Sequence, residues 1–310
     1  MKRIYHLCYS SHDEVLFREA EDHDYFFNFA ALSAYRTNTE ILAEAEMSTH
    51  VHLAVLTEVP TKFVGQLRTS YTKYFNKKYG RTGRMGEHGS FCLPIEGNLH
   101  IQTMISYVLR NPLHHGQVST AFGYPYTSTN CMFAKELGKA HDVPVIHDTL
   151  EKKRYLPRKA VFPSTWKMSS SGFFLRDSVV EIQKAEMYYI TPRNFIYQMN
   201  RISDERWQQE QQDDHTGEPI SLPLIEPWAD KALVSEMLTN EKGWKYSKDR
   251  KSDMEICQMI DLKLQKECKG TTVYTISDTK KNSLYKYFMR NYRLQEMQLR
   301  RCFAMDYHNP

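Results

Sequence analysis

Residues 40–57 read EILAEAEMSTHVHLAVLT, and this stretch decides the fold. Two runs rich in apolar and β-favouring residues, 40–47 and 51–57, stand on either side of Ser48-Thr49, which predicts two strands joined by a short turn. Residues 3–10 (RIYHLCYS) alternate polar and apolar side chains and predict a strand before them, and residues 90–95 predict another after them.

Helical patterns fill the spaces between these strands. Apolar residues recur at helical spacing in 22–37, in 61–79 before Gly80, and in a segment that begins at Asn98 and is expected to stop at Pro112. The predicted order is strand, helix, two strands, helix, strand, helix. That order favours an α+β fold, a ferredoxin-like antiparallel sheet with its helices on one face.

Length and composition indicate how the rest of the chain is organised. The 310 residues suggest two domains, and their 41 basic and 37 acidic residues leave a net charge of only +4. No apolar run is long enough for a bilayer, and the basic start lacks the apolar core of a secretory signal. Six scattered cysteines without a CxxC motif suit a reducing cytosol. A polar, Gln/Asp-rich stretch at 204–223 predicts a linker, and 224–310 predicts a mostly helical region.

His50 and His52 stand two residues apart at the start of an apolar strand. Strand side chains alternate between faces, so both imidazoles point the same way, with Cα atoms about 7 Å apart. Two such rings can converge on one divalent cation. The alternative interpretation is a pair of half-buried histidines on a strand face.

The segment 98–111 adds a phenol and an amide. Tyr107 and Asn111 lie one turn apart, on the same helical stripe as His100. Placed opposite the histidine pair, they could bring a phenol oxygen to a phosphodiester whose charge a metal neutralises. Otherwise Tyr107 is a tyrosine at the edge of the core, and Asn111 ends a helix before Pro112.

Positive charge is gathered in three places, 59–86, 152–159 and 280–301, and aromatic residues are interleaved in the first of them. Local positive density of this kind favours a polyanion such as nucleic acid, and the aromatics could stack the bases of a single strand. The alternative is solvated helix faces whose aromatics belong to the core. The DNA-contacting candidates are Arg68, Lys73, Lys77, Lys78, Arg81, Arg84, Lys280, Lys281, Arg290, Arg293, Arg300 and Arg301.

Three linked motifs resemble one family. MSTHVHLAV resembles the His-hydrophobic-His (HUH) motif of the insertion-sequence-200-like single-tyrosine transposases. YVLRNPLHHGQV resembles the catalytic-tyrosine helix of the branch associated with repetitive extragenic palindromes, and YFNKKYGRTGR is similar to a segment between the two motifs. The resemblance covers residues 1–126. Ser48-Thr49 stands where the family usually has Pro-Asn, and the Trp-x-Gly-Arg stretch after the basic helix is replaced by MGEHGSF.

The resemblance implies a metal-dependent single-stranded DNA endonuclease and strand transferase, a transposase that acts near hairpin or palindromic DNA. It implies that Tyr107 is the nucleophile, forming a 5′-phosphotyrosine intermediate, and that His50, His52 and Asn111 bind Mg²⁺ or Mn²⁺. It implies no membrane partner, a bacterial cytoplasmic location at the nucleoid, and a homodimer as one option, since the family includes dimers and monomers.

The C-terminal region is open to two interpretations. Residues 278–305 predict two basic helices separated near residues 291–293, loosely like a helix-turn-helix that could hold the stem of a hairpin. The other interpretation is a basic helical pair that packs on its own domain or on a second subunit. The role of residues 127–203 is left unassigned.

Two other functions compete with the nuclease. One is a catalytically silent regulator that keeps only hairpin recognition, which would not require all four of His50, His52, Tyr107 and Asn111. The other is a metal-dependent hydrolase of small phosphoesters, which usually needs further carboxylate ligands and leaves the basic clusters unexplained.

Overall fold

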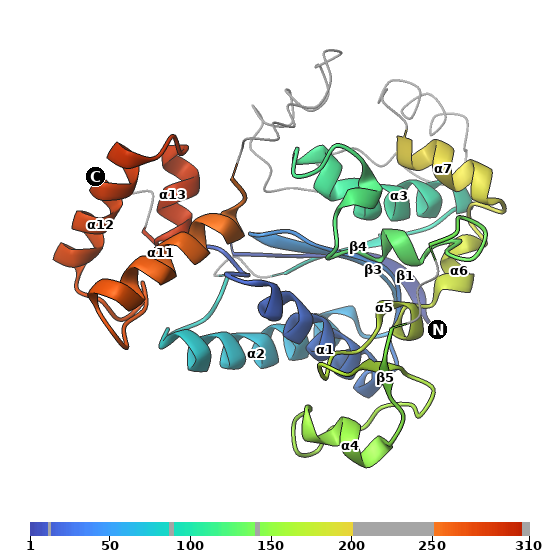
Figure 1. Ribbon diagram of the computed structural model, residues 1–310. Coiled ribbons are helices and arrows are strands. Elements are labelled where there is room, and N and C mark those ends of the chain that lie inside the picture. The colour runs from blue at the N-terminus through green and yellow to red at the C-terminus, as the bar shows by residue number, and fades with distance from the viewer. Residues whose placement is uncertain (12–13, 87–89, 140–142, 201–250, 306–310) are drawn as a thin grey trace.

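The computed structural model describes residues 1–11, 14–86, 90–139, 143–200 and 251–305. Its first part contains four strands and three long helices (Figure 1). In chain order these are β1 (Arg3–Ser10), α1 (Ala20–Arg36), β2 (Glu40–Glu46), β3 (His50–Thr57), α2 (Pro60–Tyr79), β4 (Ser90–Ile95) and α3 (Asn98–His114).

The four strands form one antiparallel sheet in the order β2-β3-β1-β4. The register pairs Cys8 of β1 with His52 of β3 and with Phe91 of β4. Because alternate residues of a strand share a face, the even-numbered residues of β1 and β3 face one way and the odd-numbered residues face the other.

Each face of the sheet carries its own core. The odd-numbered side chains Leu7, Val51 and Val55 pack with aromatic residues of α1 and α2, which cover that face. On the other face Ala54 and Ile95 pack against the apolar stripe of α3, namely Ile101, Met104, Ile105 and Val108. Helices therefore cover both faces, and the face beneath α3 is the one that carries His50 and His52.

Residues 127–200 attach along the free edge of β2. Their short elements are η2 (Ser128–Cys131), β5 (Val145–Ile146), α4 (Thr149–Arg154), β6 (Met168–Ser169), α5 (Arg176–Val179), α6 (Ile182–Glu186) and α7 (Pro192–Asn200), preceded by η1 (Ala121–Gly123). The Glu46 amide donates to the carbonyl of Tyr126, the residue directly before this segment, and the Glu181 amide donates to that of Ile41. This segment thus pairs with backbone groups that an edge strand would otherwise expose.

Three helices form the C-terminal unit: α11 (Asp253–Glu267), α12 (Asp278–Asn291) and α13 (Glu296–Cys302). They enclose a separate core that also takes in Val15 from the N-terminal part. Gly80, at the end of α2, has φ +66, and a Cβ there would lie 2.7 Å from Thr275 Cγ2. Glycine is therefore needed at this position both for its backbone angle and for the close approach of the C-terminal unit.

The predicted fold class is confirmed: an α+β fold with an antiparallel sheet and a helical C-terminal region. The placement of all helices on one face is wrong, because α3 covers the face opposite α1 and α2. The predicted stop at Pro112 is also wrong, since α3 continues to His114. Proline there removes only one N–H near the end of the helix, where the His115 amide still bonds the Asn111 carbonyl. The predicted linker at 204–223 lies outside the described residues.

Candidate functional site

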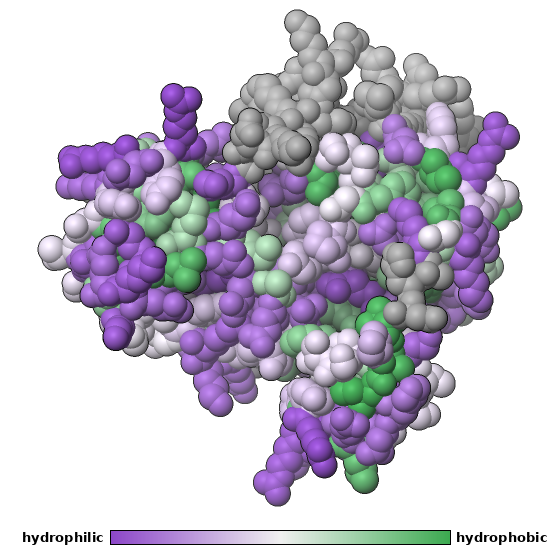
Figure 2. Space-filling view, viewed as in Figure 1, coloured by the Kyte–Doolittle hydropathy of each residue, from purple (hydrophilic) through white to green (hydrophobic). Residues whose placement is uncertain are grey.

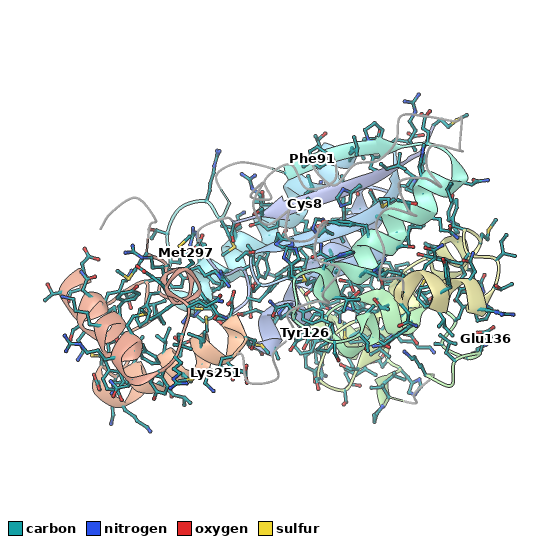
Figure 3. The ribbon with its side chains drawn as sticks, turned by 90° about the horizontal axis from the view of Figure 1, so that it is seen from above. Cys8, Phe91, Tyr126, Glu136, Lys251 and Met297 are labelled. Carbon is teal, nitrogen blue, oxygen red and sulfur yellow. The ribbon has the colours of Figure 1, made fainter. Side chains whose placement is uncertain are left out.

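β3 presents His50 and His52 to α3. Their ring centroids are 4.9 Å apart, and the ring planes cross at 77°. His52 is fully buried and His50 is partly exposed. Both lie on the even-numbered face, as strand alternation predicts. Figure 3 views this side of the molecule from above, with Cys8 and Phe91 on the adjacent strands β1 and β4.

α3 brings Tyr107 and Asn111 to this histidine pair. His50 Nε2 lies 3.1 Å from Asn111 Oδ1. The Tyr107 ring meets the His52 ring edge to face, with centroids 5.4 Å apart. The structure therefore places the four residues singled out from the sequence in one cluster. His100, on the same helical stripe, lies near the other end of α3, where its Nδ1 is 3.1 Å from the carbonyl oxygen of Glu96.

Three further histidines join the cluster. His6 of β1 is fully buried, and its Nε2 lies 3.0 Å from His52 Nδ1. The His114 ring lies 5.5 Å from the Tyr107 ring between centroids, with the planes 28° apart, and the His115 ring lies 4.9 Å from that of His50. Tyr107 is 4% exposed, whereas His50, His114 and His115 are partly exposed. The cluster thus reaches the surface on the side of these three histidines.

The sequence pointed only weakly to these additional rings. His114 and His115 stand just past Asn111, where the sequence suggests either a spare metal or phosphate contact or ordinary loop histidines. His6 shares its strand face with Cys8, the register partner of His52, but that register becomes visible only once the sheet is formed. Alternation along 3–10 places His6 on one face without telling which strand lies beside it.

Two donor atoms of the cluster have a spacing that a bound divalent cation would also allow. His50 Nε2 and Asn111 Oδ1 are within hydrogen-bond distance at 3.1 Å, and two ligands at right angles, each about 2.1 Å from Mg²⁺, would be about 3.0 Å apart. Asn111 is fully buried, and its Nδ2 has no hydrogen-bond partner within the described part of the chain. Among the described residues no three His, Cys, Asp or Glu side chains come together as a metal-binding group. A cation here would therefore take two imidazoles and an amide oxygen.

The DNA-contacting candidates are not gathered with Tyr107. Those of residues 68–84 lie on α2 or just after it, and α2 covers the opposite face of the sheet. Lys78 forms ion pairs with Glu19, Glu21 and Asp22, and Arg81 pairs with Glu14. The exposed members of this group are Lys73, Lys77 and Arg84, whereas Arg68 is partly buried.

In the C-terminal unit several candidates are also engaged within the protein. Lys280 pairs with Glu267, Arg300 with Glu296, and Arg301 with Asp253. Lys281 is partly buried at the start of α12, whereas Arg290 and Arg293, at and just beyond its end, are exposed. Figure 2 shows hydrophilic residues over much of the visible surface of these three helices.

A separate charged cluster lies on the other face of the sheet, the one covered by α1 and α2, at the edge formed by β2. Arg176 donates to Glu44 and Glu46 of β2, at 2.7 and 3.0 Å, and His23 Nδ1 lies 2.9 Å from the other Glu46 oxygen. Burial raises the pKa of both glutamates, against the opposing effect of Arg176. Burial also lowers the pKa of His23 well below its usual range, and the nearby charge of Arg176 lowers it further. This cluster anchors residues 127–200 and does not touch Tyr107 in the contacts described.

Comparisons with known proteins find likenesses among solved structures. No protein-family model matches the chain, and no curated protein matches it. A solved structure of a REP-associated tyrosine transposase bound to a REP hairpin matches at a TM-score of 0.38 and 12% identity, over 46% of this chain and 88% of that one. The likeness is low, so the case for an activity depends on this chain's own geometry. Across the described residues, no helix combines the length and apolar character needed to cross a membrane.

Proposed function

We propose that this protein is a metal-dependent nuclease and strand transferase that cuts single-stranded DNA beside hairpins, with Tyr107 as its nucleophile. The observation that supports the proposal best is the chain of contacts between β3 and α3 that joins Asn111 to His50, His50 to His52, and His52 to Tyr107. Packing alone explains this arrangement poorly, because the buried Asn111 amide has an N–H group without a hydrogen-bond partner in the described part of the chain, and such a group lowers the stability of a core.

His50, His52 and Asn111 would hold Mg²⁺ or Mn²⁺. Bound there, the cation would neutralise charge on the scissile phosphate. The imidazoles must offer lone pairs, so each ligating nitrogen must be the unprotonated one. For His50 this means that Nδ1 keeps the proton, and Nδ1 lies 3.2 Å from Thr49 Oγ1, which can accept it.

Tyr107 would carry the covalent step. Its phenol oxygen attacks phosphorus and loses its proton, the bond from phosphorus to the 3′-oxygen breaks, and that oxygen leaves as a 3′-hydroxyl. The product is a 5′-phosphotyrosine link, which keeps the phosphodiester's energy, so another 3′-hydroxyl can reverse the step onto new DNA without ATP. The rings of His52 and His114 flank the phenol and limit its orientations.

A labelled hairpin with a single-stranded flank tests the proposal. With Mn²⁺, 3′-end-labelled DNA should stay with the protein through denaturation, whereas 5′-end-labelled DNA should be released as a shorter strand. Tyr107→Phe should abolish the adduct and leave hairpin binding intact. Tyr197→Phe, at an exposed tyrosine of α7, is the matched control. A Tyr107→Phe protein that still cuts would show that the nucleophile is wrong.

Two further outcomes separate the competing functions. Binding of the hairpin by the native protein without any adduct would favour the silent regulator. Hydrolysis of a small phosphodiester with neither adduct nor hairpin binding would favour the phosphoesterase. His50→Ala and His52→Ala should each remove metal-dependent cleavage, and undiminished cleavage in either would contradict the ligand assignment.

A further inference from the structure

His6 and His52 make a contact that the proposed reaction does not use directly. They lie on adjacent strands as diagonal neighbours, since the direct partner of His6 is Ala54 and that of His52 is Cys8. Diagonal side chains of neighbouring strands lie within reach of each other when they are long. Here His6 Nε2 lies 3.0 Å from His52 Nδ1.

The ring geometry identifies this contact as a hydrogen bond in the plane of the rings. The two planes differ by 14°, and the centroids are 5.1 Å apart. Rings in face-to-face contact would be about 3.5–4 Å apart, so these rings meet side by side. In that arrangement an N–H of one ring points along the lone pair of the other. Both side chains are fully buried, so water does not compete for the bond.

We propose that His6 is a positioning residue that fixes His52 as the tautomer with its proton on Nδ1. The His52 Nδ1–H donates to His6 Nε2, which leaves the lone pair on His52 Nε2, the nitrogen that can ligate a cation. The opposite arrangement would put a proton on His52 Nε2 and block ligation by the neutral ring. Outer partners of this kind orient ligating histidines and raise their basicity.

The inference deepens the proposed function and rests on it, because it gives His6 its purpose through the metal site. It explains why a polar ring is buried under α3, beside apolar side chains of the same face such as Ile4, Ala54 and Ile95. A buried imidazole without a task would cost stability relative to an apolar residue of similar size.

The first test uses metal-free protein and nitrogen NMR of its histidines. The native protein should show His52 with its proton on Nδ1. His6→Phe should shift His52 toward a tautomer mixture or the Nε2-protonated form, and His6→Gln, whose carbonyl oxygen can accept at the same place, should restore Nδ1 protonation. His100→Gln, at a buried histidine that lies on α3, is the control and should leave His52 unchanged. An unchanged His52 tautomer in His6→Phe would overturn the inference.

The second test measures binding of Mn²⁺ alone by calorimetry. His6→Phe should weaken binding about 10–100-fold, the range found for outer partners of metal ligands, and His6→Gln should recover most of it. If the native protein binds Mn²⁺ in a way that His50→Ala and His52→Ala abolish, but His6→Phe binds equally well, only the inference about His6 fails. If the native protein binds no Mn²⁺ at all, the metal site of the proposed function fails, while the tautomer measurement still decides the role of His6.

Discussion

Ser48 Oγ donates a 2.7 Å hydrogen bond to Asp253 Oδ2 across 205 residues of sequence. Ser48 lies in the turn just before His50, and Asp253 is the first residue of α11. The same carboxylate accepts from Arg301 and Gln298 of α13. The C-terminal unit therefore holds the turn that leads into the strand of the candidate metal ligands. Tyr126, labelled in Figure 3, makes another contact with α11, where its hydroxyl donates to the Met254 sulfur.

Ser48→Ala should lower the free energy of unfolding by about 1.5–3 kcal/mol, because it removes a hydrogen bond to a charged acceptor. Urea unfolding measures the loss. Ser283→Ala, at an exposed serine of α12, is the control and should change stability by less than about 0.5 kcal/mol. Equal effects of the two substitutions would contradict an energetic role for the link to Asp253.

Arg18→Met should destabilise the protein by about 3 kcal/mol, the lower end of the cost of breaking a buried ion pair. The Arg18 guanidinium is 1% exposed, makes two bonds to Asp261 and donates to the carbonyl of Cys302. Asp261 is 32% exposed, so water can partly solvate it once Arg18 is gone, which limits the loss.

Urea unfolding checks this prediction, with Arg290→Met at an exposed arginine as control. The double variant Arg18→Met, Asp261→Leu should recover part of the loss, because it leaves no charge without its partner. If Arg18→Met unfolds at the same urea concentration as the native protein, the contact between the two parts of the chain contributes nothing measurable.

Local patterns were enough to predict most of the secondary structure and the two pairs of site residues, one on a strand and one on a helix. His50 and His52 share a face because strands alternate, and Tyr107 and Asn111 share a stripe because helices repeat. Both relations depend on a few adjacent residues. The prediction for residues 90–95 coincides with β4.

Relations that depend on distant segments could not be predicted. His6 meets His52 only through the register of β1 and β3, and Arg176 meets Glu44 across 132 residues. Counting basic residues also overstated the DNA-contacting surface, because some of them are paired with carboxylates inside the protein. Lys78 pairs with Glu19, directly before α1, and Arg301 pairs with Asp253 of α11. A charge in the sequence becomes a free binding surface only if folding leaves it exposed.

Arg290→Ala and Arg293→Ala should each weaken hairpin binding and lower the slope of log affinity against log salt by about 0.9, the value for one duplex phosphate contact. Both arginines are exposed at and beyond the end of α12. Lys280→Ala is the control on the same helix, because Lys280 is already paired with Glu267. Fluorescence anisotropy at several salt concentrations measures the slopes. Identical slopes in all three variants would show that the end of α12 does not contact the stem.

His23→Asn should make the protein less sensitive to acid. The His23 ring is sandwiched between Phe17 and Tyr126, at 3.9 and 3.7 Å between ring centroids, and its burial lowers its pKa well below its usual range. As pH falls below about 6.5, His23 becomes protonated in the unfolded chain but stays neutral in the folded chain. The free energy of unfolding therefore falls by up to about 1.4 kcal/mol per pH unit. Asparagine can still donate to Glu46 but does not titrate.

Unfolding free energies between pH 7.5 and pH 5 measure this effect as the difference between the native protein and His23→Asn. Glu44 and Glu46 act with the opposite sign, because burial raises their pKa and their contribution is lost as pH rises; both proteins contain them, so their effect largely cancels in the difference. His147→Asn, at an exposed histidine, should follow the native curve. Parallel curves for the native protein and His23→Asn would mean that His23 takes up its proton equally well in the folded state, in spite of its burial between two aromatic rings.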